Sequence, residues 1–187
     1  TRRRAPRATG LHGWQTTECL TTWPARETAL VIVDMWDRHW SRGANERVAP
    51  LAPRIDAIAR AARQAGVLII HAPSEVTDAY VDHPARRNAL SAPYVELPDP
   101  VDHPDPPLPI DDSDGGSDSG ELSWWRAWSR QHPAITIEPE DTLSANLQEI
   151  HNVLAQRAIR RLIYCGVQLN MCVLNRPFGI KRMVWQG

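Results

Sequence analysis

Two short apolar runs separated by one helical pattern constrain the fold of this chain most. The first run is Ala-Leu-Val-Ile-Val at residues 29–33, and the second is Val-Leu-Ile-Ile at 67–70. Continuously apolar runs of this length are typical of strands covered on both faces. Between them, apolar residues recur every three or four positions over about 47–65, and Gly66 supplies a stop signal for that helix. The order strand–helix–strand predicts a parallel pair joined by a right-handed crossover.

The same alternation continues in the second half of the chain. It predicts a third strand at 134–137, a helix at 144–158, a fourth strand at 161–165 and a helix that begins at Asn175. Strands alternating with helices indicate an α/β fold with a doubly wound, mostly parallel central sheet and helices on both faces. Functional sites of such sheets lie beyond the carboxyl ends of the strands. The last helix predicts either further strands beyond Gly187 or a sheet with fewer strands.

The chain divides into a short arm and one domain. Its 187 residues suffice for one domain with a substantial core. Residues 1–28 are polar and arginine-rich at their start, and we expect an arm laid over the domain at 29–187. An insertion at 93–133 contains a proline- and aspartate-rich stretch, 97–120, which predicts a long surface excursion or lid. We expect three tryptophans to anchor it to the core rather than to wall a pocket: Trp124, Trp125 and Trp128.

Charge and cysteine content exclude several classes of protein. The net charge of −1 at neutral pH favours neither nucleic acid nor an anionic membrane as a partner. No apolar run approaches the roughly 20 residues that a membrane-spanning helix needs. Three scattered cysteines form neither a disulfide framework nor a zinc ribbon. A nucleotide site or a serine hydrolase is not supported, because the chain has no glycine-rich phosphate loop and no Gly-x-Ser-x-Gly motif. A small-molecule substrate is the expected partner. The chain begins at Thr1 rather than at methionine, which leaves its compartment open.

A carboxylate and a thiol follow two of the predicted strands. Asp34 comes directly after the strand at 29–33, and Cys172 lies six residues past Gly166, beyond the fourth strand. A thiol at a turn into a helix can act as a nucleophile, because backbone amides there lower its pKa and can hold an oxyanion. We therefore expect Asp34 to take the proton of Cys172. Otherwise Asp34 caps a turn and Cys172 is a small buried side chain, or Cys172 responds to redox conditions together with Cys165.

Three further polar residues are expected at the same rim of the sheet. Asp37 and His39 lie just beyond Asp34, and His71 follows the second strand. One carboxylate and two imidazoles can bind a divalent metal ion or line a polar pocket, whereas hydrogen-bonded surface histidines are the simpler interpretation. The sequence requires no cofactor, and a divalent metal ion is an open alternative.

The segments around Asp34 and Cys172 resemble those of a known family. Ala-Leu-Val-Ile-Val-Asp-Met-Trp-Asp at 29–37 and Gly-Val-Gln-Leu-Asn-Met-Cys-Val at 166–173 are similar to motifs of the isochorismatase-like cysteine hydrolases, which include the nicotinamidases. The similarity spans roughly residues 28–187, with the insertion set within it. It implies a doubly wound α/β fold. It also implies hydrolysis of a small amide, or of a related C–N or vinyl-ether bond.

The roles of single residues follow from this resemblance. It implies that Cys172 is the nucleophile and that Asp34 is the base that deprotonates it. The peptide bond between Val167 and Gln168 is expected to be cis, and the amides of Gln168 and Cys172 to form an oxyanion hole. Trp36 is expected to form a wall of the pocket. Members of the family commonly oligomerise, so we expect a homo-oligomer.

The resemblance also implies a catalytic lysine just after the third strand. Residues 138–141 read Glu-Pro-Glu-Asp there, and the only lysine of the chain is Lys181, beyond the nucleophile. Loss of such a positive group costs several kcal/mol of transition-state stabilisation, on the scale of about one oxyanion donor. Arg86, Arg87 and His71 are the candidates to replace it. The sequence thus predicts a cysteine hydrolase, with a catalytically inactive ligand-binding or assembly module as the alternative.

Overall fold

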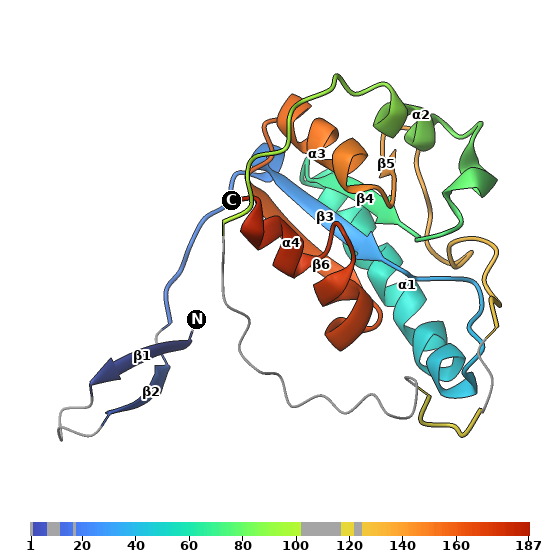
Figure 1. The fold of residues 1–187 in the computed structure, drawn as a ribbon, viewed down its shortest axis with the longest axis horizontal. Helices are drawn as coiled ribbons and strands as arrows, with labels where there is room; N and C mark the ends of the chain where they lie inside the picture. Colours follow the sequence, from blue (N-terminus) through green and yellow to red (C-terminus); the bar gives the residue numbers. More distant parts are fainter. Residues whose placement is uncertain (1, 7–11, 17, 102–116, 122–124) are drawn as a thin grey trace.

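Within the described residues, four parallel strands form the central sheet of an α/β protein (Figure 1). The structure is a computed structural model of the 187-residue chain, and it describes all residues except 1, 7–11, 17, 102–116 and 122–124. The strands run in the order β5–β4–β3–β6. Their bounds are Thr28–Val33 for β3, Leu68–Ala72 for β4, Thr142–Leu143 for β5 and Arg161–Gly166 for β6. The α/β class and the parallel sheet expected from the sequence are confirmed.

Helices cover both faces of this sheet. They are α1 (Arg42–Gln64), α2 (Pro84–Leu90), α3 (Leu147–Gln156) and α4 (Ile180–Trp185). Side chains of β3 alternate between the two faces, as strand geometry requires. Leu30 and Ile32 pack with residues of α1, whereas Val31 and Val33 pack with residues of α3 and α4. This burial on both faces explains why the strand is apolar at every position.

The strand order creates a crevice at the carboxyl ends of β3 and β6. Val33, the last residue of β3, pairs with Ala72 of β4 on one side and with Gly166 of β6 on the other. The chain moves outward from β3 through β4 to β5, and then crosses back to place β6 on the opposite side of β3. In open α/β sheets, ligands bind where the order reverses in this way. The residues that follow β3 and β6, from Asp34 and from Val167, therefore meet at one place.

The third predicted strand, at 134–137, is wrong. Partners outside the sheet take the amides of this segment: the Ile135 amide donates to the His132 carbonyl in a turn at 3.0 Å, and the Thr136 amide donates to the Asp56 side chain of α1 at 2.9 Å. Ile135 is buried against the α1 face of the sheet although it belongs to no strand. The two-residue strand β5 pairs with β4 instead.

The segment beyond β6 also differs from the expectation of a helix from Asn175. A short π-helical turn spans Leu169–Val173, and α4 begins only at Ile180. The Asn175 side chain donates to the Asn170 carbonyl at 3.2 Å instead of capping a helix. Gly179 precedes α4, where a Cβ would lie 2.8 Å from the Leu174 carbonyl oxygen. The chain folds back closely at this glycine before the last helix starts.

Capping residues set the starts of two other helices. α1 begins at Arg42, five residues before the predicted start, because the Ser41 side chain accepts a hydrogen bond from the Ala44 amide. α3 begins after Asn146, whose side chain accepts from the Glu149 amide at 3.1 Å. The expected helix at 144–158 is therefore present in a shorter form.

The N-terminal arm contains an antiparallel hairpin of β1 (Arg2–Pro6) and β2 (His12–Thr16). In Figure 1 this hairpin lies beside the domain, not over it as expected. Among the described residues, no helix combines the length and the apolar character needed to cross a membrane.

Candidate active site

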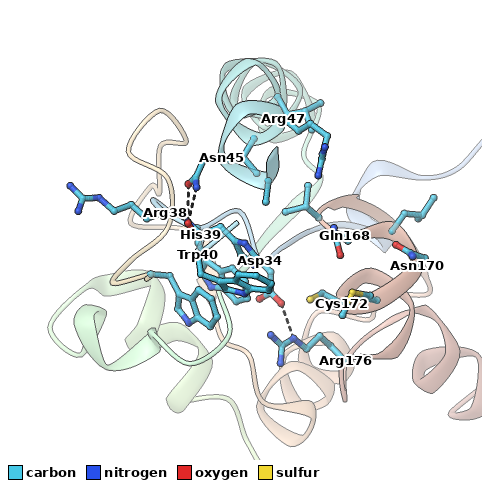
Figure 2. A pocket seen from close by; sticks show the side chains of 18 of the residues that line it. Asp34, Arg38, His39, Trp40, Asn45, Arg47, Gln168, Asn170, Cys172 and Arg176 are labelled. Carbon is cyan, nitrogen blue, oxygen red and sulfur yellow. Dashed lines mark hydrogen bonds and ion pairs between the residues drawn. The ribbon is translucent and has the colours of Figure 1, made fainter. Parts of the chain in front are cut away.

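A cavity of about 470 Å³ lies in the crevice beyond β3 and β6. Figure 2 shows it between α1, the turn that follows β6, and the aromatic residues that follow β3. Its lining includes Asp34 and Cys172, which the sequence paired. Other lining residues are Trp36, His39, Gln168 and Arg176.

Asp34 is held rigidly at the floor of this cavity. Its side chain is 0% exposed, and its backbone adopts a left-handed conformation with φ 48°. The Asp34 amide donates to the Ala72 carbonyl at 3.1 Å. One carboxylate oxygen accepts from the Ser74 amide at 2.8 Å, and the other accepts from Nε of Arg176 at 2.7 Å. The apolar strand β3 thus ends on a fixed carboxylate.

A close approach of β6 to β3 brings the cysteine turn to this carboxylate. Gly166 has φ 129°, and a Cβ there would lie 2.0 Å from the Val33 carbonyl oxygen, so only glycine fits. The next peptide bond, Val167–Gln168, is cis, and it is the bond at which the resemblance placed one. The π-helical turn then carries Cys172 back over the end of β3.

The structure brings Cys172 and Asp34 together. Both side chains line the cavity, and the Asp34 carboxylate and the Gln168 amide lie close enough to the sulfur to shift the pKa of its thiol. Burial, followed by the nearby Asp34 carboxylate, raises the pKa of the Cys172 thiol to about 11. The Arg176 charge and the Gln168 amide act in the opposite direction, because both favour the thiolate. At neutral pH the resting sulfur is therefore a thiol.

Arg176 is a charged residue of this cavity that the sequence argument missed. Its amide donates to the Cys172 carbonyl at 3.0 Å, so one helical turn separates the two residues and sets both side chains on one face. Its guanidinium pairs with Asp34 and lies 5.8 Å from the ring centre of Trp36. Burial opposes its charge, but Asp34 and Cys172 raise the pKa of Arg176. Its spacing of four residues after Cys172 was the signal that could have found it.

The three residues considered as substitutes for the lysine lie elsewhere. Arg86 forms an ion pair with Glu149 of α3, and Arg87 is exposed on α2. His71 is fully buried, with one ring nitrogen 3.1 Å from Gln131 and the other 3.0 Å from Asp141. None of the three lines the cavity, whereas Arg176 does.

Asp37, His39 and His71 do not converge, contrary to the expectation that they crowd onto one rim. The Asp37 carboxylate accepts from the amide and the hydroxyl of Ser129, and these bonds hold the pKa of Asp37 low although burial opposes this. His71 points into the core, and only His39 lines the cavity. In the part of the chain that the structure describes, no group of three or more His, Cys, Asp or Glu is placed to hold a metal ion.

Aromatic rings form one wall of the cavity. Trp36, expected there from the resemblance, stacks on Trp128 with ring centres 4.2 Å apart, and His39 stacks on Trp128 at 5.6 Å. Burial lowers the pKa of His39, so this imidazole is neutral at neutral pH. Trp128 is buried and also lines the cavity, so it both anchors its segment and walls the pocket. Trp125 is 56% exposed, and Trp124 lies outside the described residues.

The turn after β4 connects these parts of the site, and the sequence argument did not single it out. The Ser74 amide holds Asp34, and the Ser74 carbonyl accepts from the indole nitrogen of Trp36 at 3.1 Å. Glu75 follows with φ 68°, a left-handed conformation that is unusual for a residue other than glycine. Its carboxylate accepts from the indole nitrogen of Trp128 at 3.2 Å and lies 3.9 Å from Nη1 of Arg176.

Comparison of this chain with models of protein families and with curated proteins finds no match.

Proposed function

We propose that this chain is a cysteine hydrolase of the isochorismatase-like type, which cleaves a small amide or a related C–N or vinyl-ether bond. One observation carries the proposal: a thiol and a carboxylate meet at the floor of a cavity, where the strand order of the sheet reverses. Nucleophilic catalysis requires a nucleophile within reach of a base, in a space that admits the substrate.

In the first proposed step, Asp34 takes the proton of the Cys172 thiol while the sulfur attacks the carbonyl carbon of the substrate. The electron pair of the C=O bond moves to oxygen, and the amides of Gln168 and Cys172 hold the resulting oxyanion. The C–N bond then breaks, and the leaving nitrogen takes the proton from Asp34. The acyl group stays on Cys172 as a thioester.

In the second proposed step, Asp34 takes a proton from water, and the oxygen of that water attacks the thioester carbon. The C–S bond breaks, the sulfur recovers a proton from Asp34, and a carboxylic acid leaves. Each step uses side chains and amides of the chain itself. A thiol with a raised pKa is compatible with this scheme, because the thiol loses its proton only as it attacks.

Arg176 is proposed to supply the positive charge that the resemblance assigns to a lysine. Its ion pair with Asp34 and its position beside Cys172 support this role. The charge stabilises the thiolate as it forms and orients the carboxylate that accepts the proton. An arginine one turn beyond the nucleophile would thus replace a lysine from another strand.

The alternative is a module that binds a ligand without turnover. The raised pKa of Cys172 favours this alternative, because a protonated thiol is a weak nucleophile and a carboxylate paired with an arginine is a weak base. Both proposals predict that small molecules bind in the cavity. Only the hydrolase predicts that Cys172 becomes acylated.

The deciding experiment measures ammonia or amine release from a panel of small amides by the parent chain and by Cys172→Ala. We expect turnover by the parent, a fall of at least about 10³-fold in Cys172→Ala, and an acyl adduct on Cys172 by mass spectrometry. Asp34→Asn should abolish turnover as well.

Cys165→Ala is the matched control. Burial raises the pKa of Cys165 to about 11 as well, but this thiol packs on the α1 face of the sheet and does not line the cavity. Its loss should leave turnover unchanged. Turnover that survives in Cys172→Ala would exclude the proposed mechanism. Binding without turnover in the parent would favour the ligand-binding module.

A further inference from the structure

Glu75 presents a carboxylate to the cavity with unused capacity to accept hydrogen bonds. The side chain is 43% exposed and lines the cavity beside Arg176. One carboxylate oxygen accepts from the Trp128 indole. The other lies 3.9 Å from Nη1 of Arg176, which is too far for a direct hydrogen bond. An ionised carboxylate accepts about four hydrogen bonds, so this oxygen can take a donor from a bound molecule.

The backbone holds Glu75 in this place. Its φ of 68° is strained for a residue with a side chain, and such strain gathers at binding and catalytic sites. The Arg126 guanidinium donates to the Glu75 carbonyl, and the neighbouring Val76 is buried in one cluster with Trp36 and Trp128. The carboxylate is therefore presented to the cavity from a fixed turn.

Glu75 is the more weakly paired carboxylate of the cavity, because its ion pair with Arg176 is 3.9 Å long. Arg176 is taken up by Asp34 at 2.7 Å, and Arg47 pairs with Asp118 through two hydrogen bonds of 2.7 and 3.1 Å. Arg38 lines the cavity as well, but it is exposed, and in Figure 2 its side chain points away from the other labelled residues. Asp34, Glu75 and Arg176 together carry a net negative charge at the floor. A cation is thus the complementary ligand group.

We infer that Glu75 determines specificity by binding a protonated amine, so that the preferred substrate is a small amide that also carries an ammonium group. The ammonium donates to the free oxygen of Glu75, while the amide carbonyl lies over Cys172. This inference rests on the proposed function for the amide part of the substrate. The recognition of the cation depends only on Glu75 and its surroundings.

The test compares three benzamides of nearly the same shape: one with an aminomethyl group, one with a methyl group and one with a carboxylate at the meta position. Their binding is measured by calorimetry on the 187-residue chain with Cys172→Ala, which cannot form a thioester. We expect the ammonium probe to bind about 10-fold more tightly than the methyl probe, as for one charge-assisted hydrogen bond to a half-exposed group. The carboxylate probe should bind more weakly than either.

Glu75→Gln in the same background should remove the preference for the ammonium probe. Glutamine keeps an oxygen that accepts from the Trp128 indole, so the wall stays in place while the charge is lost. Glu46→Gln is the matched control, because Glu46 is an exposed carboxylate on α1 that pairs with Arg42 outside the cavity. It should keep the preference.

Equal binding of the three probes, tighter binding of the carboxylate, or a preference that persists in Glu75→Gln would overturn the inference. Turnover is measured separately, with the same amides and the parent chain. A clear ammonium preference without any turnover would exclude the hydrolase and leave the role of Glu75 intact. Turnover without an ammonium preference would support the hydrolase and exclude the role of Glu75.

Discussion

Two aspartate–arginine pairs in this protein have similar chemistry and different surroundings. Asp141, which is 1% exposed, accepts from Arg63 through two bonds of 2.9 and 2.7 Å, from His71 at 3.0 Å and from the Glu138 amide at 2.8 Å. Asp34 accepts from one amide and from Arg176, and its remaining neighbour is the thiol of Cys172. Donors from the protein occupy the Asp141 carboxylate fully. The Asp34 carboxylate instead lies next to a thiol that lines the cavity.

The backbone is also more strained around the cavity than around Asp141. Two of the described non-glycine residues with positive φ, Asp34 and Glu75, line the cavity, and the third, Ala158, follows α3. Such conformations cost about 1–3 kcal/mol each and persist where the surroundings enforce them. No residue of the Asp141 cluster is among them. The comparison separates a buried, fully paired Asp141 cluster from an Asp34 cluster that lies open to a cavity, which is the arrangement that the proposed chemistry needs.

The largest expected effect on stability comes from breaking the Asp141 cluster. Asp141→Asn leaves Arg63 as a charge with little compensation and weakens the bond to buried His71. Loss of one partner of a buried ion pair typically costs about 3–5 kcal/mol. We expect the free energy of unfolding, measured by urea denaturation, to fall by that amount. Cavity ligands should still bind at temperatures where the variant is folded.

Asp118→Asn is the control for this prediction. Asp118 also forms a two-bond pair with an arginine, but its side chain is 59% exposed. Solvent screens exposed pairs, so this variant should lose little stability. Equal losses in the two variants would contradict the distinction between the clusters.

Breaking the Asp34–Arg176 pair should affect activity more than stability. Arg176→Met keeps most of the side-chain volume but removes the charge next to Cys172 and Asp34. We expect kcat/KM for amide hydrolysis to fall by about 10²–10³-fold, which is the effect of removing one donor that stabilises developing charge. The measurement is steady-state turnover of the best amide in the panel.

Arg87→Met separates this role from a general loss of positive charge. Arg87 was a sequence-based candidate for the missing cation, but it is exposed on α2 and away from the cavity. Its replacement should leave kcat/KM unchanged. A fall in Arg87→Met similar to that in Arg176→Met would refute the assignment of Arg176.

Lowering the pH should reduce the stability that the Asp141 cluster contributes. Hydrogen bonds from His71 and Arg63 outweigh burial and hold the pKa of Asp141 below its ordinary value of 3.8. The stabilisation from this shift is fully present above pH 3.8 and is lost as the pH falls through the lower pKa of the folded state. The free energy of unfolding should therefore decrease below pH 3.8 and decrease less steeply in Asp141→Asn. An equally steep decrease in the free energy of unfolding below pH 3.8 in both proteins would contradict this prediction.

The parts of the fold that the sequence predicted are those that local pattern determines. β3 and the first part of β4 are continuous apolar runs, and α1 has an apolar face, so their burial is visible in the order of residues. The meeting of Asp34 and Cys172 follows from the rule that carboxyl ends of parallel strands share one edge. The two-residue strand β5 carries no such pattern, because its pairing with β4 is a tertiary contact.

Residues whose partners come from distant segments escaped the sequence argument. Arg176 reaches Asp34 only because Gly166 allows β6 to approach β3 closely. Glu75 acquires its role from a strained turn and from Trp128, more than 50 residues away. His71 was expected at the rim, but its place in the β4–β5 register, opposite Leu143, puts it in the core. Spacing along the chain places Arg176 one helical turn after Cys172, but it contains no information on these distant partners.

The smallest predicted effect concerns the thiol of Cys172, and its sign distinguishes a carboxylate neighbour from simple burial. The Asp34 charge is the second cause, after burial, of the raised pKa of Cys172, which is about 11. Asp34→Asn removes that charge and frees Arg176 to face the sulfur, so the pKa should fall. Alkylation of Cys172 by iodoacetamide, followed on its peptide by mass spectrometry at pH 8–10, should accelerate although amide turnover is lost.

Arg176→Met should shift the same thiol in the opposite direction, because it leaves Asp34 without a compensating cation. The pKa of Cys172 should rise further and alkylation should slow. Cys165 on the same digest is the internal reference, since burial alone raises its pKa and neither substitution adjoins it. If Asp34→Asn slowed alkylation of Cys172, or if both variants moved its rate in one direction, burial alone would control the sulfur. Asp34 would then not be the group that exchanges a proton with it.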